Sequence, residues 1–556
     1  MDIADKIAES DRIIKFLQKI DDGYEPSSSE YLALTEVESL SLNDWGNNYV
    51  PDSIRYLTNL KTLTISFSKV TSLDALQNLN NLEELYVIGA QVSDFQWITK
   101  LDKLRTLFFY SPSIESLDGL ESLVHLQELY LDVSQVIKID VLPHLVELQS
   151  LSLDTHPDTC LDPIATMTSL RELSLRTHQS IKISKFHKLV NLEGLSLSGV
   201  KQVCLEGIDK LEGLKALSMP NVEVLNPHEL QKLTMLTDLN ISHTGICDLS
   251  YIKKLTKLQS LTLTDTEVSN LQELSMLTTL KSLTISGAKI TSTTGLEKLT
   301  NLEKLHLHDT EITDLSTLQA LNKLIELNVS RSAITSIDGI QEFTNLQKLD
   351  ISYTGVTYIP SWIGNLKNLI SIDLSGLHLH SIPIELEQLN LPFSFSHVYR
   401  YDENDIRLRD TVLATQPISL FEQPRELIKA YYDAEQVPVN EAKVIFLGDG
   451  GVGKTHTIRR IHNNGEQGDY NAQTTPGISI TNFAAQYNDH SFTIHFWDFG
   501  GQEIMHAMHR CFLTNRTCYV VVLSNRWDLD RQARYWLKNI DSFAKGASVI
   551  LAINKW

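Results

Sequence analysis

A glycine-rich segment followed by lysine and threonine carries the clearest chemistry in this sequence. It follows the apolar run Ala442–Leu447 and precedes a predicted helix over Thr457–His462, so it fits G-x-x-x-x-G-K-[ST] between a strand and a helix. Backbone N–H groups would surround phosphate oxygens, Lys454 would reach the β and γ oxygens, and the Thr455 hydroxyl would hold Mg²⁺. The predicted nucleotide-binding residues are Gly448, Gly450, Gly451, Val452, Gly453, Lys454 and Thr455.

Two more motifs follow, each at the end of a predicted strand. Thr475-Pro-Gly lies 21 residues after Lys454, and Asp498-Phe-Gly-Gly-Gln follows the apolar run Phe492–Trp497. A threonine there binds Mg²⁺ only while a γ-phosphate is present, and an aspartate at the second motif reaches Mg²⁺ through water. The second glycine of this motif, Gly501, would offer its N–H to the γ-phosphate, and the glutamine would orient the attacking water. We predict Gln502 and Thr475 as catalytic residues, Gly501 as a nucleotide-binding residue, and Thr455, Thr475 and Asp498 as metal ligands.

The last residues of the sequence resemble the beginning of a base-recognition motif. The apolar stretch Leu551-Ala-Ile553 runs into Asn554-Lys555, as in N-K-x-D, whose aspartate reads guanine through paired hydrogen bonds. We therefore add Asn554 and Lys555 to the predicted nucleotide-binding residues, and we expect the sequence to stop inside this domain. The three phosphate motifs favour a GTPase over an ATP-driven switch, which is kept as an alternative.

Leucines recur every 22 residues through most of the chain. They occupy positions 60, 82, 104, 126, 148, 170, 192, 214, 236, 258, 280, 302, 324 and 346, with Val37 before them and Leu369 and Leu391 after them. Each unit contains an L-x-L alternation, which predicts one short strand with inward leucines, and a second apolar set that predicts a turn or short helix. Because neighbouring units must stack to bury these side chains, we predict a parallel-strand solenoid of about 16 repeats over residues 37–396.

The ninth position of the repeat carries small hydroxyl residues such as Thr244 and Ser332. A hydroxyl can bond the backbone of a turn, and we interpret these residues as structural. Ala90 and Pro112 replace the hydroxyl in early repeats. This predicts a less regular N-terminal half.

The segments on either side of the repeats are predicted to be helical in part. Within residues 1–36, Ile13, Leu17 and Ile20 have helical spacing and predict an amphipathic capping helix that ends before Gly23. Residues 397–440 predict a polar linker with a helix over Arg425–Tyr431, which we expect to pack against the following domain, residues 441–556.

Composition excludes several classes of protein. With 42% hydrophobic and 21% charged residues the chain is globular, and its net charge of −21 argues against general binding to nucleic acid or anionic membranes. The 5 cysteines are scattered, which is typical of reduced thiols. No apolar run approaches the ~18 residues of a membrane span. We predict a cytoplasmic protein with no membrane span.

The sequence as a whole resembles the Roco family, whose members join leucine-rich repeats to a Ras-of-complex (Roc) G domain. The 22-residue units resemble leucine-rich repeats, and the Roc resemblance depends on Trp497-Asp-Phe-Gly-Gly-Gln-Glu-Ile-Met-His506-Ala-Met-His509-Arg-Cys-Phe-Leu-Thr514. The resemblance implies an α/β chain, a leucine-rich-repeat solenoid followed by an incomplete Ras-like P-loop GTPase domain, with GTP or GDP and Mg²⁺ as ligands. It also implies a slow, dimer-regulated switch, with a homodimer formed through a COR domain expected beyond Trp556.

Two histidines and two arginines that follow the Asp498-Phe-Gly-Gly-Gln motif need separate interpretation. His506 and His509 have helical spacing, but no group of cysteines or carboxylates accompanies them, so we assign them to a switch helix rather than a metal site. Arg510 and Arg516 could stabilise charge during hydrolysis, although surface pairing is the favoured role.

Aromatic residues mark one part of the predicted concave surface. Tyr86, Phe108 and Tyr130 occupy one column between inward leucines in three successive repeats, and the column then turns to serine. Such a ladder is a candidate protein-binding patch, and its alternative is a set of exposed aromatics covered by flanking loops.

These observations predict a slowly hydrolysing GTPase switch coupled to a leucine-rich-repeat protein-interaction solenoid. The alternative is a scaffold, in which a nucleotide-loaded domain does not hydrolyse GTP and the repeats bind a protein partner. The presence of Gln502 and Thr475 favours the switch.

Overall fold

The chain forms two compact units, Met1–Tyr432 and Asp433–Trp556, which are described separately. The structure is a computed structural model. It describes residues 3–43, 49–66, 70–133, 135–136, 138–395, 404–414, 418–423, 425–433, 441–463, 477–487, 490–499, 517–525, 528–544 and 546–554.

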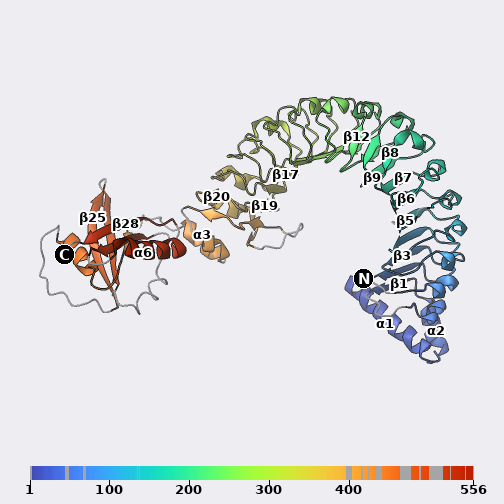
Figure 1. The fold of residues 1–556 in the computed structure, drawn as a ribbon, viewed down its shortest axis with the longest axis horizontal. Helices are drawn as coiled ribbons and strands as arrows, with labels where there is room; N and C mark the ends of the chain where they lie inside the picture. Colours follow the sequence, from blue (N-terminus) through green and yellow to red (C-terminus); the bar gives the residue numbers. More distant parts are fainter. Residues whose placement is uncertain are drawn as a thin grey trace. The chain divides into compact units, whose positions relative to one another are not determined.

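One long parallel sheet runs through the first unit (Figure 1). Its strands, in their order of pairing, are β1 (Ser39–Asn43), β2 (Thr62–Ser66), β3 (Glu84–Ile88), β4 (Thr106–Tyr110), β5 (Glu128–Val133), β6 (Ser150–Thr155), β7 (Glu172–Arg176), β9 (Gly194–Ser198), β11 (Ala216–Ser218), β13 (Asp238–Asn240), β14 (Ser260–Thr264), β15 (Ser282–Ser286), β16 (Lys304–His306), β17 (Glu326–Asn328), β18 (Lys348–Asp350), β19 (Ser371–Asp373), β22 (Ile406–Arg407) and β21 (Phe393–Ser394). Leu261 pairs with Leu283, 22 residues later, so the register follows the sequence period. The predicted leucine-rich-repeat solenoid is confirmed.

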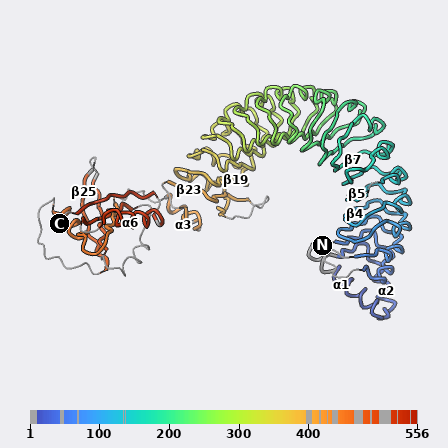
Figure 2. The backbone as a smooth tube through the Cα atoms, in the orientation of Figure 1, coloured from blue at the N-terminus to red at the C-terminus, as the bar shows by residue number. Residues whose placement is uncertain are grey.

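Short 3-10 helices return the chain from one strand to the next, from η1 (Asp52–Tyr56) to η14 (Ile384–Leu389). Figure 2 shows the resulting stack of similar coils. A second, three-stranded ladder of β8 (Ser180–Lys182), β10 (Gln202–Cys204) and β12 (Glu223–Leu225) forms where these connections become extended. Leucines such as Leu258 and Leu261 are buried in one continuous core, because no single repeat can cover its own apolar face.

The ninth-position hydroxyls bond the backbone, as predicted. Thr244 Oγ1 donates to the carbonyl of Ile241 at 2.6 Å, and Thr310 Oγ1 donates to the carbonyl of Leu307 at 2.8 Å. Both threonines are buried. The hydroxyl therefore satisfies a carbonyl at the turn that would otherwise be buried without a partner.

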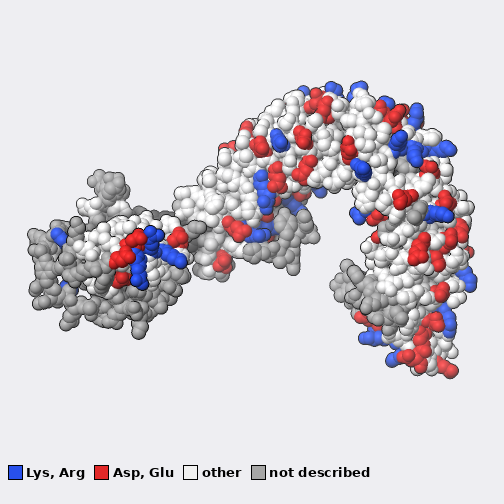
Figure 3. All heavy atoms as spheres, viewed as in Figure 1, with Lys and Arg blue, Asp and Glu red and all other residues white. Residues whose placement is uncertain are grey.

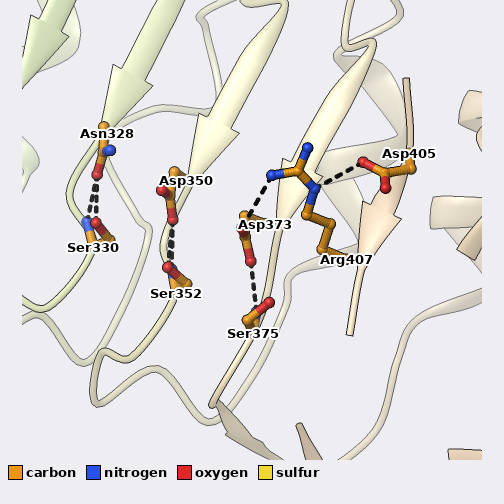
Figure 4. Close-up of polar contacts among 8 residues, drawn as sticks. All are labelled: Asn328, Ser330, Asp350, Ser352, Asp373, Ser375, Asp405 and Arg407. Atoms are coloured by element: carbon orange, nitrogen blue, oxygen red, sulfur yellow. Dashed lines mark hydrogen bonds and ion pairs between the residues drawn. The ribbon is translucent and has the colours of Figure 1, made fainter. Parts of the chain in front are cut away.

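The prediction that the N-terminal half is less regular is wrong for the strands. Strands β2 to β7 have five or six residues, whereas β13, β17, β18 and β19 have three. In these later repeats an Asn or Asp ends the strand, and its carboxylate or amide oxygen accepts hydrogen bonds from a serine two residues on, as in the pairs of Figure 4. Such side-chain bonds compete with the strand ladder and turn the chain earlier.

The N-terminal cap consists of two helices, α1 (Ile3–Asp21) and α2 (Ser28–Thr35). Leu17 of α1 is fully buried in the solenoid core, and the Ser53 hydroxyl donates to its carbonyl at 2.9 Å. Ser27 and Glu30 form a capping box that starts α2, a helix that the spacing of apolar residues did not predict. The cap thus closes the first repeat with a helix rather than a strand.

The C-terminal end of the solenoid differs from the sequence expectation. Residues 404–414 carry β22, which pairs with β19, and β23 (Val412–Leu413), which pairs with β20 (His378–Leu379), although their composition is that of a polar linker. Ile406 and Leu408 are buried in the solenoid core. A strand from beyond the last leucine repeat therefore lies between β19 and β21.

Helix α3 (Arg425–Asp433) also packs on the solenoid, where we had expected packing against the following domain. Ile428 is buried in the solenoid core, and the Tyr432 hydroxyl donates to the carbonyl of Ile382. The buried face of the helix is set by Ile428 rather than by Leu427, which is exposed.

The second unit is a five-stranded sheet with the order β25-β26-β24-β27-β28. The elements are β24 (Glu441–Leu447), α4 (Lys454–His462), β25 (Ile478–Tyr487), β26 (His490–Phe499), β27 (Cys518–Ser524), α6 (Leu529–Phe543) and β28 (Val549–Asn554). All neighbours are parallel except β25 and β26. Alternate residues of β24 enter two cores: Ile445 packs with Trp536 of α6, and Phe446 packs with Ile458 of α4.

Candidate functional site

The candidate site lies where the parallel strands of the second unit end. Because β24, β26 and β28 run in the same direction, the residues that follow them meet at one edge of the sheet. The glycine-rich loop leaves β24 there and enters the N-terminus of α4. A helix N-terminus with free N–H groups favours an anion, so this edge suits phosphate.

Two glycines of the loop are required by its backbone. Gly448 has φ +145°, and a Cβ on it would lie 2.4 Å from the carbonyl oxygen of Val522. Gly453 has φ +93° and caps α4. Gly450 and Gly451 lie exposed on the outer part of the loop, whereas Val452 is buried below them. The buried side chain of Val452 thus holds the loop against the core, while the backbone at Gly450 and Gly451 is exposed to solvent.

Lys454 is the buried cation of the site. Its side chain is 6% exposed, and Nζ donates to the carbonyl oxygens of Gly448 at 2.8 Å and Asp449 at 3.1 Å. Burial lowers the pKa of the ammonium group, while the negative charges of Asp498 and Asp449 act in the opposite direction. The ammonium is therefore held beneath the loop that would surround a phosphate.

Thr455 and Asp498 are brought together from separate elements. The Thr455 hydroxyl, in the first turn of α4, donates to Oδ2 of Asp498, near the end of β26, at 2.5 Å. Asp498 is 4% exposed. A hydroxyl and a carboxylate are hard oxygen donors of the kind that Mg²⁺ prefers, so these residues fit the cation that the sequence predicts.

Asn554 connects the far strand to the glycine-rich loop. Its Nδ2 donates to the carbonyl of Val452 at 2.9 Å, across 102 residues of sequence. The structure thus brings together the described members of the predicted site. The predicted residues Thr475, Gly501, Gln502 and Lys555 lie outside the described residues, as do His506, His509, Arg510 and Arg516.

A buried polar pair at the end of β27 was not predicted. The side chain of Gln532 makes two hydrogen bonds with the backbone of Ser524. Its Nε2 donates to the Ser524 carbonyl at 3.3 Å, and its Oε1 accepts from the Ser524 N–H at 3.5 Å. Both residues are buried. The pair fixes α6 to the strand beside β24. The feature of the sequence that could have predicted this pair is Gln532 itself, a polar residue on the otherwise apolar face of α6.

The aromatic column of the solenoid is continuous. The rings of Tyr86 and Phe108 are 6.4 Å apart, and those of Phe108 and Tyr130 are 6.0 Å apart. All three side chains are partly exposed on the sheet face opposite the core. On the face that Figure 3 shows, acidic and basic side chains are interspersed along the solenoid.

Two kinds of feature are absent from the described residues. No cluster of three or more His, Cys, Asp or Glu side chains there is arranged to hold a metal ion. None of the helices in the described ranges has the length and apolar character needed to cross a membrane.

Comparisons with known proteins agree with this geometry. Residues 443–556 match the family described as "Ras of Complex, Roc, domain of DAPkinase", and residues 278–320 match "Leucine Rich repeats (2 copies)". The probable serine/threonine-protein kinase pats1 of Dictyostelium discoideum is 27% identical over 212 residues, or 34% of this chain and 6% of that protein. The probable serine/threonine-protein kinase roco5 of the same organism is 32% identical over 83 residues, or 14% of this chain and 3% of that protein.

Two further comparisons concern the separate units. The Ras-related protein Rab7 of Gossypium hirsutum is 36% identical over 80 residues, or 14% of this chain and 38% of that protein. A leucine-rich-repeat protein of Leptospira interrogans superposes with a TM-score of 0.51 at 22% identity, over 63% of this chain and 99% of that one, which shows the fold alone. The chain spans well under half the length of each of these curated relatives. Since leucine-rich repeats precede a Ras-like Roc domain along it, the chain is a Roco-type protein.

Proposed function

We propose that the second unit binds GTP and GDP with Mg²⁺ and that the protein is a slow GTPase switch coupled to a partner-binding solenoid. The observation that carries the proposal is the convergence of Lys454, the Thr455–Asp498 pair and Asn554 at one edge of the sheet. The match of residues 443–556 to the Roc family supports guanine as the base.

Each described residue of the site has a role in this proposal. The loop from Gly448 to Gly453 would offer N–H groups to phosphate oxygens, and Lys454 would exchange its carbonyl partners for the β and γ oxygens. Thr455 and Asp498, with Thr475, would hold Mg²⁺, which would neutralise charge on the phosphates. Asn554 would keep the loop in place and, with Lys555, would border the base.

Hydrolysis is proposed to depend on residues outside the described part of the chain. Gln502 would orient water, while Thr475 and the Gly501 N–H would respond to the γ-phosphate. Intrinsic turnover in such switches is on the order of 10⁻⁴ s⁻¹, and an arginine supplied in cis or by a partner raises it by up to ~10⁵-fold. We therefore expect a slow enzyme when the protein is measured alone.

The solenoid is proposed to bind a protein partner through its concave surface, with Tyr86, Phe108 and Tyr130 at the centre of the contact. Clustered aromatic side chains often supply most of the binding energy of an interface. The ring spacings of 6.4 Å and 6.0 Å support a single continuous patch.

Calorimetric titration of full-length protein with GDP, GTP and ATP in Mg²⁺ buffer tests the nucleotide proposal, with Lys454→Ala as the control. We expect guanine nucleotides to bind, ATP not to bind, and the variant to lose binding. Equal ATP binding would favour the ATP-driven switch. Absence of binding to any nucleotide by folded protein would contradict the proposal.

Single-turnover hydrolysis then separates the switch from the scaffold. Gln502→Leu should slow hydrolysis while leaving GTP affinity unchanged. A wild-type protein that binds GTP but hydrolyses no more than the variant would favour the scaffold.

A further inference from the structure

The aromatic patch continues into a hollow on the concave sheet face. Tyr130 is the last aromatic ring of the column, and it also lines one end of a hollow of about 360 Å³. The floor of this hollow is the serine column from Ser152 to Ser218. Gly194 and Ala216, which carry no side chain larger than a methyl group, line the hollow beside that column. We call the surface from Tyr86 to Asn240 the concave groove.

Carboxylates border the concave groove on both sides. Strand residues that flank its central column from β3 to β13 carry six acidic side chains and one basic side chain, Arg176, which pairs with Asp154 at 3.7 Å. The acidic residues are Glu84, Glu128, Glu172, Asp238, Asp132 and Asp154. The groove thus combines stacked aromatic rings with an excess of negative charge.

Two of these carboxylates lie in surroundings that disfavour their charge. Burial, followed by the nearby charge of Glu193, raises the pKa of Glu172. Burial and the charge of Asp132 raise the pKa of Asp154. A Cβ on Gly194 would lie 1.8 Å from Oε2 of Glu172, so this carboxylate lies over Gly194 at the side of the serine column. Lys215 near Glu172 and Arg176 near Asp154 act in the opposite direction, and a further cation beside either carboxylate would favour its charged form.

We propose that the concave groove binds an extended segment of a partner protein that carries arginine side chains next to an apolar or aromatic residue. This inference rests on the proposed role of the solenoid in partner binding and adds the chemistry of the partner. Anionic partners are disfavoured because six carboxylates border the groove.

Arginine suits both parts of the groove. Its planar guanidinium stacks on aromatic faces such as Phe108 and Tyr130, and it also forms paired hydrogen bonds with carboxylates such as Glu172 and Asp238. Lysine would supply the charge without the stacking. The alternation of side chains along an extended segment would place every second residue against the sheet face.

Selection from a random phage-displayed library of 12-residue peptides tests the proposal. The bait is full-length protein, and the comparison bait is Glu172→Gln/Asp238→Asn, which removes two carboxylates that line the hollow. The matched control is Glu311→Gln/Glu342→Gln, because both residues are exposed, lie outside the groove and leave the same net charge. We expect sequences with arginine beside an aromatic or aliphatic residue to be enriched by the wild type and the control only.

Fluorescence anisotropy with a labelled selected peptide then measures the affinity. Glu172→Gln/Asp238→Asn should weaken binding about tenfold, since two ion pairs at exposed positions are lost. Phe108→Ala should weaken it further, and raised salt should weaken wild-type binding. Replacing the arginine of the peptide by citrulline should lower affinity more than replacing it by lysine. Unchanged melting temperatures and GDP affinities of the variants show that the fold and the nucleotide site are retained.

Each outcome bears on a different claim. Selected peptides that need Phe108 but contain no basic residue would overturn the arginine inference and leave the proposed partner-binding surface standing. Peptides that bind the Glu172→Gln/Asp238→Asn and Phe108→Ala variants as well as they bind the wild type would overturn both claims, as would a failure to enrich any peptide. GDP titration of the same preparations tests the nucleotide proposal independently.

Discussion

The hydroxyl of Thr455 and the carboxylate of Asp498 meet at 2.5 Å, although 43 residues separate them in the sequence. The contact ties the first turn of α4 to the end of β26 and places the carboxylate near the buried ammonium of Lys454. Folding of the chain therefore brings one cation, Lys454, close to two hard oxygen donors, Thr455 and Asp498. A phosphate–Mg²⁺ ligand would find these groups already positioned, which lowers the entropic cost of binding it.

The first prediction concerns the charge of Asp498. Asp498→Asn keeps the shape of the side chain but removes the negative charge, so GDP affinity in Mg²⁺ buffer should fall about tenfold or more. Addition of EDTA should weaken GDP binding to the wild type much more than to the variant. Titration with a fluorescent GDP analogue measures both effects. Asp541→Asn, an exposed position on α6, is the control, and an unchanged response to EDTA in Asp498→Asn would remove this residue from the metal site.

The second prediction concerns the contact between Asn554 and Val452. Asn554→Ala removes a hydrogen bond to the loop carbonyl and should weaken GDP binding about tenfold by loosening the loop. Asn539→Ala is matched, because Asn539 also donates to a backbone carbonyl at 2.8 Å, that of Tyr535, but on the exposed surface of α6. Dissociation rates of the fluorescent analogue compare the two variants. Equal rates would mean that Asn554 does not position the loop.

The periodic part of the fold was predictable from local pattern. Leucines at a spacing of 22 fix both the strand and its register, because each repeat contacts its neighbours alone and no long-range choice arises. Strand β22 could not be predicted in this way. Ile406 and Leu408 stand in a short polar segment, and their burial depends on pairing with β19, whose strand residues lie 34 positions earlier.

The residue types of the site were predictable from its motifs, but their hydrogen-bond partners were not. Lys454 and Asp498 follow from spacing and from their positions at strand ends. The carbonyl partners of Lys454 and the contact of Asn554 with Val452 depend on the three-dimensional path of the loop, which no local pattern encodes. The Ser524–Gln532 pair was missed for the same reason.

The third prediction uses two neighbouring carboxylates of the solenoid, Asp350 and Asp373 (Figure 4). Burial, and the nearby charge of Asp373, raise the pKa of Asp350 above its ordinary value of 3.8, so its ionised form destabilises the fold at pH 7. Asp350→Asn should stabilise the protein by about 1 kcal/mol at pH 7, since Asn328 accepts the same pair of bonds from Ser330 in the preceding repeat.

The pH dependence of this effect has a definite sign. As pH falls through the raised pKa, folded Asp350 takes up a proton before the unfolded chain does, and its penalty disappears. The advantage of Asp350→Asn should therefore shrink as pH falls from 7 toward 4 in thermal unfolding followed by circular dichroism. Asp373→Asn should instead destabilise by about 1–3 kcal/mol, because it removes an ion pair with Arg407 at 3.7 Å. If Asp350→Asn and Asp373→Asn changed the free energy of unfolding in the same direction, the proposed difference between the two carboxylates would be contradicted.

The fourth prediction concerns the turn glycines of the repeats. Gly295 has φ +105°, and a Cβ there would lie 2.4 Å from the carbonyl oxygen of Leu271 in the preceding repeat. Gly295→Ala should lower the free energy of unfolding by about 2–4 kcal/mol, because the alanine would be strained in the left-handed region and would force the neighbouring backbone to shift. Gly245 has φ +68°, and a Cβ there would meet nothing within 4 Å. Gly245→Ala therefore carries the left-handed strain alone and should lower the free energy of unfolding by about 1 kcal/mol. If thermal unfolding gave equal losses, backbone conformation rather than the close approach of successive repeats would account for glycine at both positions.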